Sequence, residues 1–235
     1  MNAHPSEHIV KSFDTELARL TGEIVRMGEI AVAQLEAAMD VLERRDSRAA
    51  ERVIINDDAI DGLENTVGQD VVKLLVMRSP MARDLREVLA ALRISSDIER
   101  VGDYAANLAK RSMALNLAPP VAPARGLPAL AELAAELMKE VIAAYRDRDA
   151  ARAIIARARD AELDTLYNGL FRELLTYMME DPRTITSCTH LLFMAKNIER
   201  IGDHATNIAE NIWFLVNGDE PMPVREKRDF TSTQA

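Results

Sequence analysis

An internal repeat is the sequence feature that most constrains how this chain can fold. Residues 97–111 read DIERVGDYAANLAKR, and residues 197–211 read NIERIGDHATNIAEN. Over the fourteen positions that start at 97 and 197, eight residues are identical, and two more exchange Val or Leu for Ile. Two unrelated helical segments would share roughly one or two identities, so we infer that the chain contains two copies of one structural unit.

The repeat extends to a second segment in each half. DDAIDGLEN at residues 57–65 matches DAELDTLYN at residues 160–168. Apolar residues at steps of three and four predict six helices, at about residues 12–44, 47–77, 81–115, 129–146, 150–179 and 184–216. Ser12 is the expected N-cap of the first helix. The prolines of Ser79-Pro80 and Asp181-Pro182 are expected to separate the second helix from the third and the fifth from the sixth.

These patterns predict an all-α fold of two sequence-related three-helix bundles with internal pseudo-twofold symmetry. The predicted divisions are a first repeat at residues 10–117, a proline-rich linker at 118–128, a second repeat at 129–217 and a polar, disordered tail at 218–235. An aromatic content of only 4% agrees with helix rather than sheet. The pattern leaves open whether the two bundles pack side by side or end to end.

Charge and targeting signals limit the class of function. The formal net charge of -9 argues against a nucleic-acid-binding protein and permits cation binding or docking to a basic surface. The N-terminus shows no signal peptide, and no apolar run is long enough for a transmembrane helix. The single cysteine, Cys188, cannot form an intrachain disulfide and is expected to be a small buried side chain. We therefore expect a cytoplasmic protein without membrane insertion.

Four pairs of carboxylates recur at a spacing of four residues, which places both members of a pair on one helix face. The pairs are Asp57 and Asp61, Glu99 and Asp103, Asp160 and Asp164, and Glu199 and Asp203. A helical wheel puts Glu99 and Asp103 nearly opposite the core stripe, so one interpretation is a solvated acidic face paired to Arg100 or Arg200. Because the pairs recur in both halves, the other interpretation is a metal site. Two pairs on adjacent helices would supply the oxygen ligands that magnesium, manganese or iron prefer.

Residues near these pairs refine the metal hypothesis. Gly102 and Gly202 each cost about 1 kcal/mol in a helix interior, which indicates either close helix approach or room beside a metal. His204 aligns with Tyr104, and Asp97 with Asn197, so none of these is expected to be a shared ligand. We expect His204 to lie at a surface or an interface.

Taken together, the repeated (Asp/Asn)-Ile-Glu-Arg-(Ile/Val)-Gly-Asp segments and the acidic pairs of the second helices resemble the PhoU family of phosphate-uptake regulators. The segment MARDLREVLAALRISSDIERVGDYAANLAKR is similar to the most recognisable part of that family. The resemblance covers about residues 10–217 and includes both copies of the repeat. The chain departs from the repeat at Asp97/Asn197 and at Glu64/Tyr167, so the two halves are not expected to offer identical ligand sets.

The resemblance implies a function that composition and periodicity do not show. Proteins of this family are cytoplasmic, not known as enzymes, and bind clusters of iron, manganese, zinc or magnesium through paired acidic motifs. Here those positions are the eight carboxylates named above. The family restrains phosphate-starvation signalling by linking a phosphate ABC transporter ATPase to a membrane sensor histidine kinase, and a homodimer is expected. The alternative is a metal-binding carboxylate bundle that acts as a metal store or a metal-dependent enzyme.

Overall fold

The computed structural model describes residues 5–223, with side chains from residue 13 onward. Within this range the chain forms six long α-helices and no strand. They are α1 (Pro5–Arg44), α2 (Ser47–Arg78), α3 (Ala82–Leu115), α4 (Leu127–Asp147), α5 (Ala150–Glu180) and α6 (Ile185–Asn217). Short 3-10 helices, Ala122–Gly126 and Pro182–Thr184, precede α4 and α6. The all-α prediction is confirmed, and most predicted helix ends agree with the structure to within two residues.

The start of α1 and the capping of α2 differ from the prediction. Helix α1 begins at Pro5, so Ser12 lies inside the helix and the predicted N-cap at Ser12 is wrong. Proline suits the first turn of a helix because its missing N–H would have no partner there. At α2 the cap is Asp46, whose carboxylate accepts hydrogen bonds from the backbone N–H groups of Arg48 and Ala49 at 3.0 Å each.

The two turns that join the first and second helix of each half repeat the same backbone geometry. Arg45 and Arg148 adopt left-handed conformations, with φ of 54° and 53°. The Arg45 guanidinium donates to the carbonyl groups of Leu115, Asn116 and Ala118 at 3.1, 3.0 and 2.6 Å, which fastens the α1–α2 turn to the end of α3. Arg148 instead forms an ion pair with the buried Glu87 of α3. The second half is therefore tied to the first at this turn.

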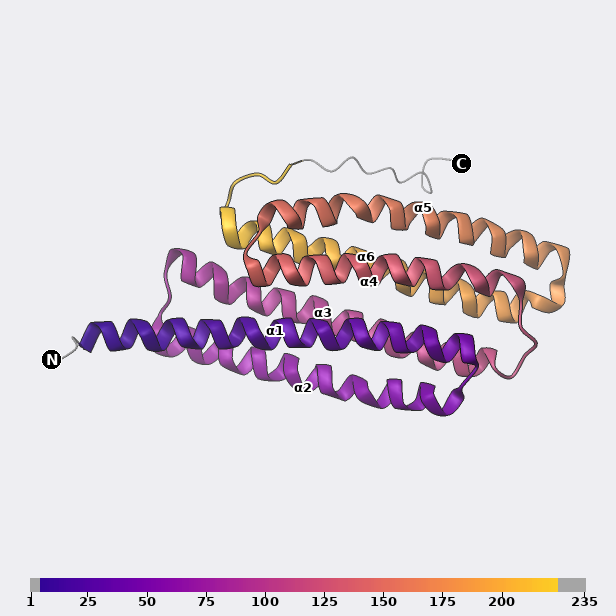
Figure 1. The fold of residues 1–235 in the computed structure, drawn as a ribbon, viewed down its shortest axis with the longest axis horizontal. Coiled ribbons are helices and arrows are strands. Elements are labelled where there is room, and N and C mark those ends of the chain that lie inside the picture. Colours follow the sequence, from indigo (N-terminus) through magenta and orange to yellow (C-terminus); the bar gives the residue numbers. More distant parts are fainter. Residues whose placement is uncertain (1–4, 224–235) are drawn as a thin grey trace.

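The two bundles lie side by side (Figure 1). Helices α3 and α6 pack against each other in the centre, and α1 and α4 pack against each other and over them. Helix α2 packs on α1 and α3, while α5 packs on α4 and α6. The α2–α3 turn and the α5–α6 turn lie at opposite ends of the molecule, as the predicted pseudo-twofold symmetry requires.

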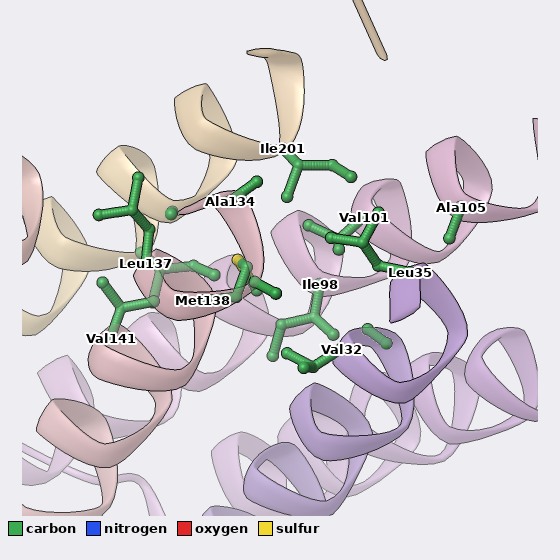
Figure 2. Close-up of a cluster of buried hydrophobic side chains, with 14 of the residues drawn as sticks. Val32, Leu35, Ile98, Val101, Ala105, Ala134, Leu137, Met138, Val141 and Ile201 are labelled. Carbon is green, nitrogen blue, oxygen red and sulfur yellow. The ribbon is translucent and has the colours of Figure 1, made fainter. Parts of the chain in front are cut away.

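A single apolar core runs through both bundles. Figure 2 shows its centre, where side chains from four helices meet. The residues labelled there are Val32, Leu35, Ile98, Val101, Ala105, Ala134, Leu137, Met138, Val141 and Ile201, and all of them are buried. Because they come from α1, α3, α4 and α6, the two halves share one continuous core.

Some predictions concern residues near the end of the chain. Most of the predicted disordered tail falls on residues 224–235, which lie outside the described part. The Trp213 indole donates to the carbonyl of Glu220 at 2.8 Å, and Arg157 donates to the carbonyl of Pro223 at 3.2 Å. These hydrogen bonds hold the first residues of the tail against α5 and α6, and the disorder predicted for residues 218–235 stays a prediction. Cys188 is buried, as predicted. No described helix is both long and apolar enough to cross a membrane.

Replacing a residue of the shared core should destabilise the whole molecule. Leu35→Ala removes a completely buried side chain from the layer between the bundles, so we expect the free energy of unfolding to fall by about 2–5 kcal/mol. Leu117→Ala is the matched control, because Leu117 is 91% exposed. Chemical denaturation followed by circular dichroism measures both. A loss for Leu35→Ala no larger than that of the control would contradict the shared core.

Candidate functional site

The carboxylate pairs of the first half lie where α2 packs against α3. A Cβ atom added at Gly102 of α3 would lie only 2.9 Å from Oδ1 of Asp57 and 2.7 Å from Cδ1 of Ile60, both on α2. The glycine therefore lets α2 approach closely and places the Asp57 carboxylate directly over α3. The Gln34 amide of α1 donates to Asp57 Oδ1 at 3.2 Å and fixes its orientation. This confirms the close-approach explanation for Gly102.

The second half repeats this arrangement. A Cβ atom at Gly202 of α6 would lie 2.5 Å from Oδ1 of Asp160 and would overlap the side chain of Leu163, both on α5. The two halves differ in burial, because Asp160 is 2% exposed whereas Asp57 is half-buried. In each half, the second helix therefore places an aspartate directly over a glycine of the third helix.

Electrostatic interactions join the two carboxylate pairs of the first half into one cluster. Burial raises the pKa of Asp57, and the charges of Asp103 and Asp61 raise it further, while the hydrogen bond from Gln34 lowers it. Burial also raises the pKa of Glu99, and the charges of Asp103 and Asp61 add to that effect. A charge on the neighbouring helix therefore raises the pKa of one carboxyl group in each pair. We call Asp57, Asp61, Glu99 and Asp103 the first carboxylate cluster.

The corresponding residues of the second half form the second carboxylate cluster, which comprises Asp160, Asp164, Glu199 and Asp203. Burial raises the pKa of Glu199, and the charges of Asp203 and Asp164 raise it as well, against the lowering effect of the Lys196 ammonium group. Both clusters therefore hold carboxylates in an environment that favours a proton or a cation over an unshielded negative charge.

Nearby cations compensate part of this charge. Arg100 lies 3.3 Å from Glu99 and 2.9 Å from Asp103, which confirms the predicted pairing to Arg100. Lys196 donates to Glu199 at 2.7 Å. The predicted pairing to Arg200 is wrong, since its guanidinium lies over the ring of Tyr104 on α3 instead.

Two residues that shape the clusters were not identified from the sequence. Lys196 stands three positions before Glu199, so helical spacing could have shown it as a partner. Gln34 lies on another helix, and no local pattern in the sequence connects it to Asp57.

The interpretation of the acidic row of α6 as a solvated face opposite the core is wrong for Glu199, whose side chain is only 13% exposed. On α5, Asp160 is only 2% exposed. The physical reason is that α3 and α6 have helices on three sides, so a second helix face is covered by α2 or α5. The carboxylates line this second contact rather than a solvated surface.

The donor types fit a hard cation, but the structure shows no assembled metal site. Within the described residues, no group of three or more His, Cys, Asp or Glu side chains is arranged so that it could hold a metal ion. In the first cluster, each pair lies within reach of the charge of the pair on the neighbouring helix. In the second cluster, Glu199 lies within reach of the charges of Asp203 and Asp164. The sequence-predicted ligands are therefore gathered by half, and their role as ligands stays a prediction.

The residues that differ between the repeats meet between the two halves. His204 of α6 lies with Nδ1 2.8 Å from Oδ1 of Asp97 on α3, and the Asn207 amide donates to the same oxygen at 3.2 Å. The ring of Tyr104 lies 5.7 Å from that of His204, measured between centroids. His204 is thus an interface residue, as predicted, and it lies at the contact of α3 with α6.

Comparison with known proteins identifies two matching stretches of the chain. The family model described as the PhoU domain matches residues 24–112 and 127–212. A relative from Xylella fastidiosa, named phosphate-specific transport system accessory protein PhoU homolog, is 61% identical over 232 residues, which cover 99% of this chain and 98% of that protein.

Solved structures show the same architecture. The crystal structure of PhoU from Pseudomonas aeruginosa matches with a TM-score of 0.84 and 32% identity, over 88% of this chain and 99% of that one. The phosphate transport system regulatory protein PhoU from Streptococcus pneumoniae matches with a TM-score of 0.82 and 26% identity, over 90% of this chain and all of that one. The fold and the sequence similarity therefore agree over almost the whole chain.

Replacing Gly202, which lies beneath Asp160, by Ala should show whether close packing or helix propensity dominates the effect on stability. Gly202→Ala introduces a methyl group that overlaps Leu163 and Asp160, so we expect a loss of about 1–3 kcal/mol in the free energy of unfolding. Gly169→Ala on α5 is the control, because its Cβ would meet nothing within 4 Å. That variant should be neutral or more stable by up to about 1 kcal/mol. Equal stabilisation of both variants, measured by urea denaturation, would rule out the close approach.

Proposed function

Because the chain belongs to the PhoU family, we propose that it is a negative regulator of phosphate-starvation signalling and phosphate uptake. In this role it acts as an adaptor between the ATPase of a phosphate ABC transporter and a sensor histidine kinase, and it catalyses no reaction itself. The observation that supports the proposal is the 61% identity, over nearly the full length, to a protein named as an accessory protein of phosphate-specific transport.

The shape of the molecule suits an adaptor. Long helices present extended faces on both halves, and exposed apolar side chains lie at both ends of the molecule. Val76 and Met77 are 76% and 68% exposed near the α2–α3 turn, and Met179 is 83% exposed near the α5–α6 turn. Exposed apolar groups of this kind favour protein contacts. We propose a cytoplasmic homodimer that reaches the membrane through its partners.

Deleting the gene should activate phosphate-regulated promoters in phosphate-rich medium, because the restraint on the kinase would be lost. A promoter fused to a fluorescent reporter measures this, and the wild-type gene supplied in trans should restore silence. Promoters that stay silent in the deletion strain under rich phosphate would refute the regulatory proposal.

We also propose that the two carboxylate clusters bind metal ions, with iron, manganese, zinc or magnesium as candidates. The support is chemical: each cluster gathers four carboxylates, and like charges together with burial raise the pKa of Asp57, Glu99 and Glu199. A bound cation would supply positive charge that neutralises this repulsion. The four carboxylates of the first cluster would hold it in the first half, and the four of the second cluster would hold it in the second.

Removing the carboxylates of α3 and α6 should abolish metal binding. We expect the variant Glu99→Ala, Asp103→Ala, Glu199→Ala, Asp203→Ala to lose metal that the wild-type protein retains, as measured by elemental mass spectrometry after purification without chelators. Because the pKa values of Glu99 and Glu199 are raised, protons should displace the metal at a higher pH than they would from ordinary carboxylates.

A variant with the same change in charge is the control for this experiment. Glu43→Ala, Glu51→Ala, Glu132→Ala and Glu173→Ala remove four exposed carboxylates outside the clusters. This control should keep its metal, and both variants should keep their helical circular dichroism. Equal metal content in the wild-type protein and the cluster variant would exclude the proposed site.

A further inference from the structure

One side of the contact between α3 and α6 remains open to solvent. Helices α1 and α4 cover the other side (Figure 1). Arg93, Arg100, Tyr104 and Arg111 recur along α3 at steps of four and seven residues, which puts them on one stripe of that helix. Arg93 and Arg100 are exposed, and so is Phe193 of α6, at 51%. We call this stripe, with the α6 side chains that meet it, the seam face.

Three arginines of the seam face lie over aromatic rings of the opposite helix. The guanidinium carbon of Arg111 lies 4.3 Å from the ring centre of Phe193 on α6, and that of Arg93 lies 5.5 Å from Phe214. Arg200 of α6 lies 5.9 Å from the ring centre of Tyr104 on α3. These cation–π contacts hold each guanidinium in place while its N–H donors remain available.

Arg93, Arg111 and Arg200 form no ion pair with a carboxylate among residues 13–223. Most other arginines of the described chain do form ion pairs, as Arg100 does with Glu99 and Asp103. The chain contains 38 acidic and 29 basic residues, so carboxylates are not scarce. Arg93, Arg111 and Arg200 are thus pre-positioned donors for a carboxylate that another molecule would supply.

We propose that the seam face docks an acidic amphipathic helix of a partner protein. From Arg93 to Arg111 the stripe extends about 27 Å, since each residue advances a helix by about 1.5 Å. A partner must therefore be elongated to reach both ends. The arginines would bind its carboxylates, and the rings of Phe193 and Phe214 would contact its apolar face.

The charges around the stripe argue against other anions. Asp97, Glu99 and Asp103 lie beside the arginines on α3, and the chain carries a net charge of -9, so a continuous phosphate backbone would be repelled. A small anion could contact only one of these arginines at a time, so it would not use the whole stripe. Asp97, held by His204 and Asn207, interrupts the stripe in the middle. The matching partner helix carries acidic residues opposite Arg93, Arg200 and Arg111 and none opposite Asp97.

This inference names the partner surface of the adaptor proposed above, and in that sense it rests on the proposed function. The test uses the full chain and a fluorescein-labelled helical peptide of about 18 residues, the length that spans about 27 Å. The peptide carries leucines on one face, glutamates near both ends and one further glutamate nearer one end, placed to face Arg200 over Tyr104. A second peptide has glutamines in place of the glutamates. Fluorescence anisotropy measures binding of each peptide.

We expect the variant Arg93→Gln, Arg111→Gln, Arg200→Gln to bind the glutamate peptide at least about tenfold more weakly than the wild-type chain, because charge-assisted hydrogen bonds are lost. The control Arg48→Gln, Arg125→Gln, Arg172→Gln removes three exposed arginines elsewhere and should bind as the wild type does. Equal binding by both variants, or equal affinity for both peptides, would overturn the proposal. So would tighter seam-dependent binding of a labelled oligonucleotide.

A reporter strain distinguishes failure of this inference from failure of the proposed function. The seam variant, but not the control, should raise promoter activity in rich phosphate. If gene deletion leaves the promoter silent, the regulatory function fails while the peptide result stands. If deletion activates the promoter but the seam variant keeps it silent and binds the peptide normally, the seam inference alone is overturned.

Discussion

Close packing around the two central helices is the constraint on which the rest of the structure depends. Helices α3 and α6 touch each other and have two further helices each around them. Their buried residues include many small ones, namely Ala90, Ala91, Gly102, Ala105, Ala106 and Ala109 on α3, and Ala195, Gly202, Ala205 and Ala209 on α6. Small side chains let helix axes approach closely, so three neighbours can pack around one helix without leaving cavities.

The carboxylate clusters follow directly from this packing. Because Gly102 and Gly202 admit α2 and α5 at short range, Asp57 and Asp160 are carried into partly or fully buried positions above them. Burial and neighbouring charges then raise the pKa of Asp57 and of Glu199, which means that the folded protein holds negative charges at a cost in free energy. The shared apolar core offsets that cost. A cation bound beside these carboxylates would remove the repulsion between their charges, so its binding would recover part of that free-energy cost.

The sequence predicted the helices and the repeat well because both depend on local patterns. Apolar spacing and the Ser79-Pro80 and Asp181-Pro182 breaks placed most helix ends within two residues. Prediction from the sequence failed where more than one face of a helix is buried. Periodicity detects the main apolar stripe, and the other faces of the helix are then assumed to be exposed to solvent. The burial of Asp160 and Glu199 therefore escaped prediction. Contacts between distant helices escaped it as well, such as that of Gln34 with Asp57.

The differences between the halves bear on function as much as the similarities do. Within the repeat, Asp97 and His204 correspond to Asn197 and Tyr104, so the contact between α3 and α6 is not symmetric although the two helices are related in sequence. Arg111 lies over Phe193 of α6, and Arg93 lies over Phe214 of α6. In the repeat, Phe193 corresponds to Arg93 and Phe214 to Ala114, so neither ring has an aromatic counterpart on α3. A symmetric surface would bind a helix equally well in both directions. The adaptor role proposed above requires that partners dock in one orientation, and the asymmetric row of charges would supply that direction without disturbing the symmetric core beneath it.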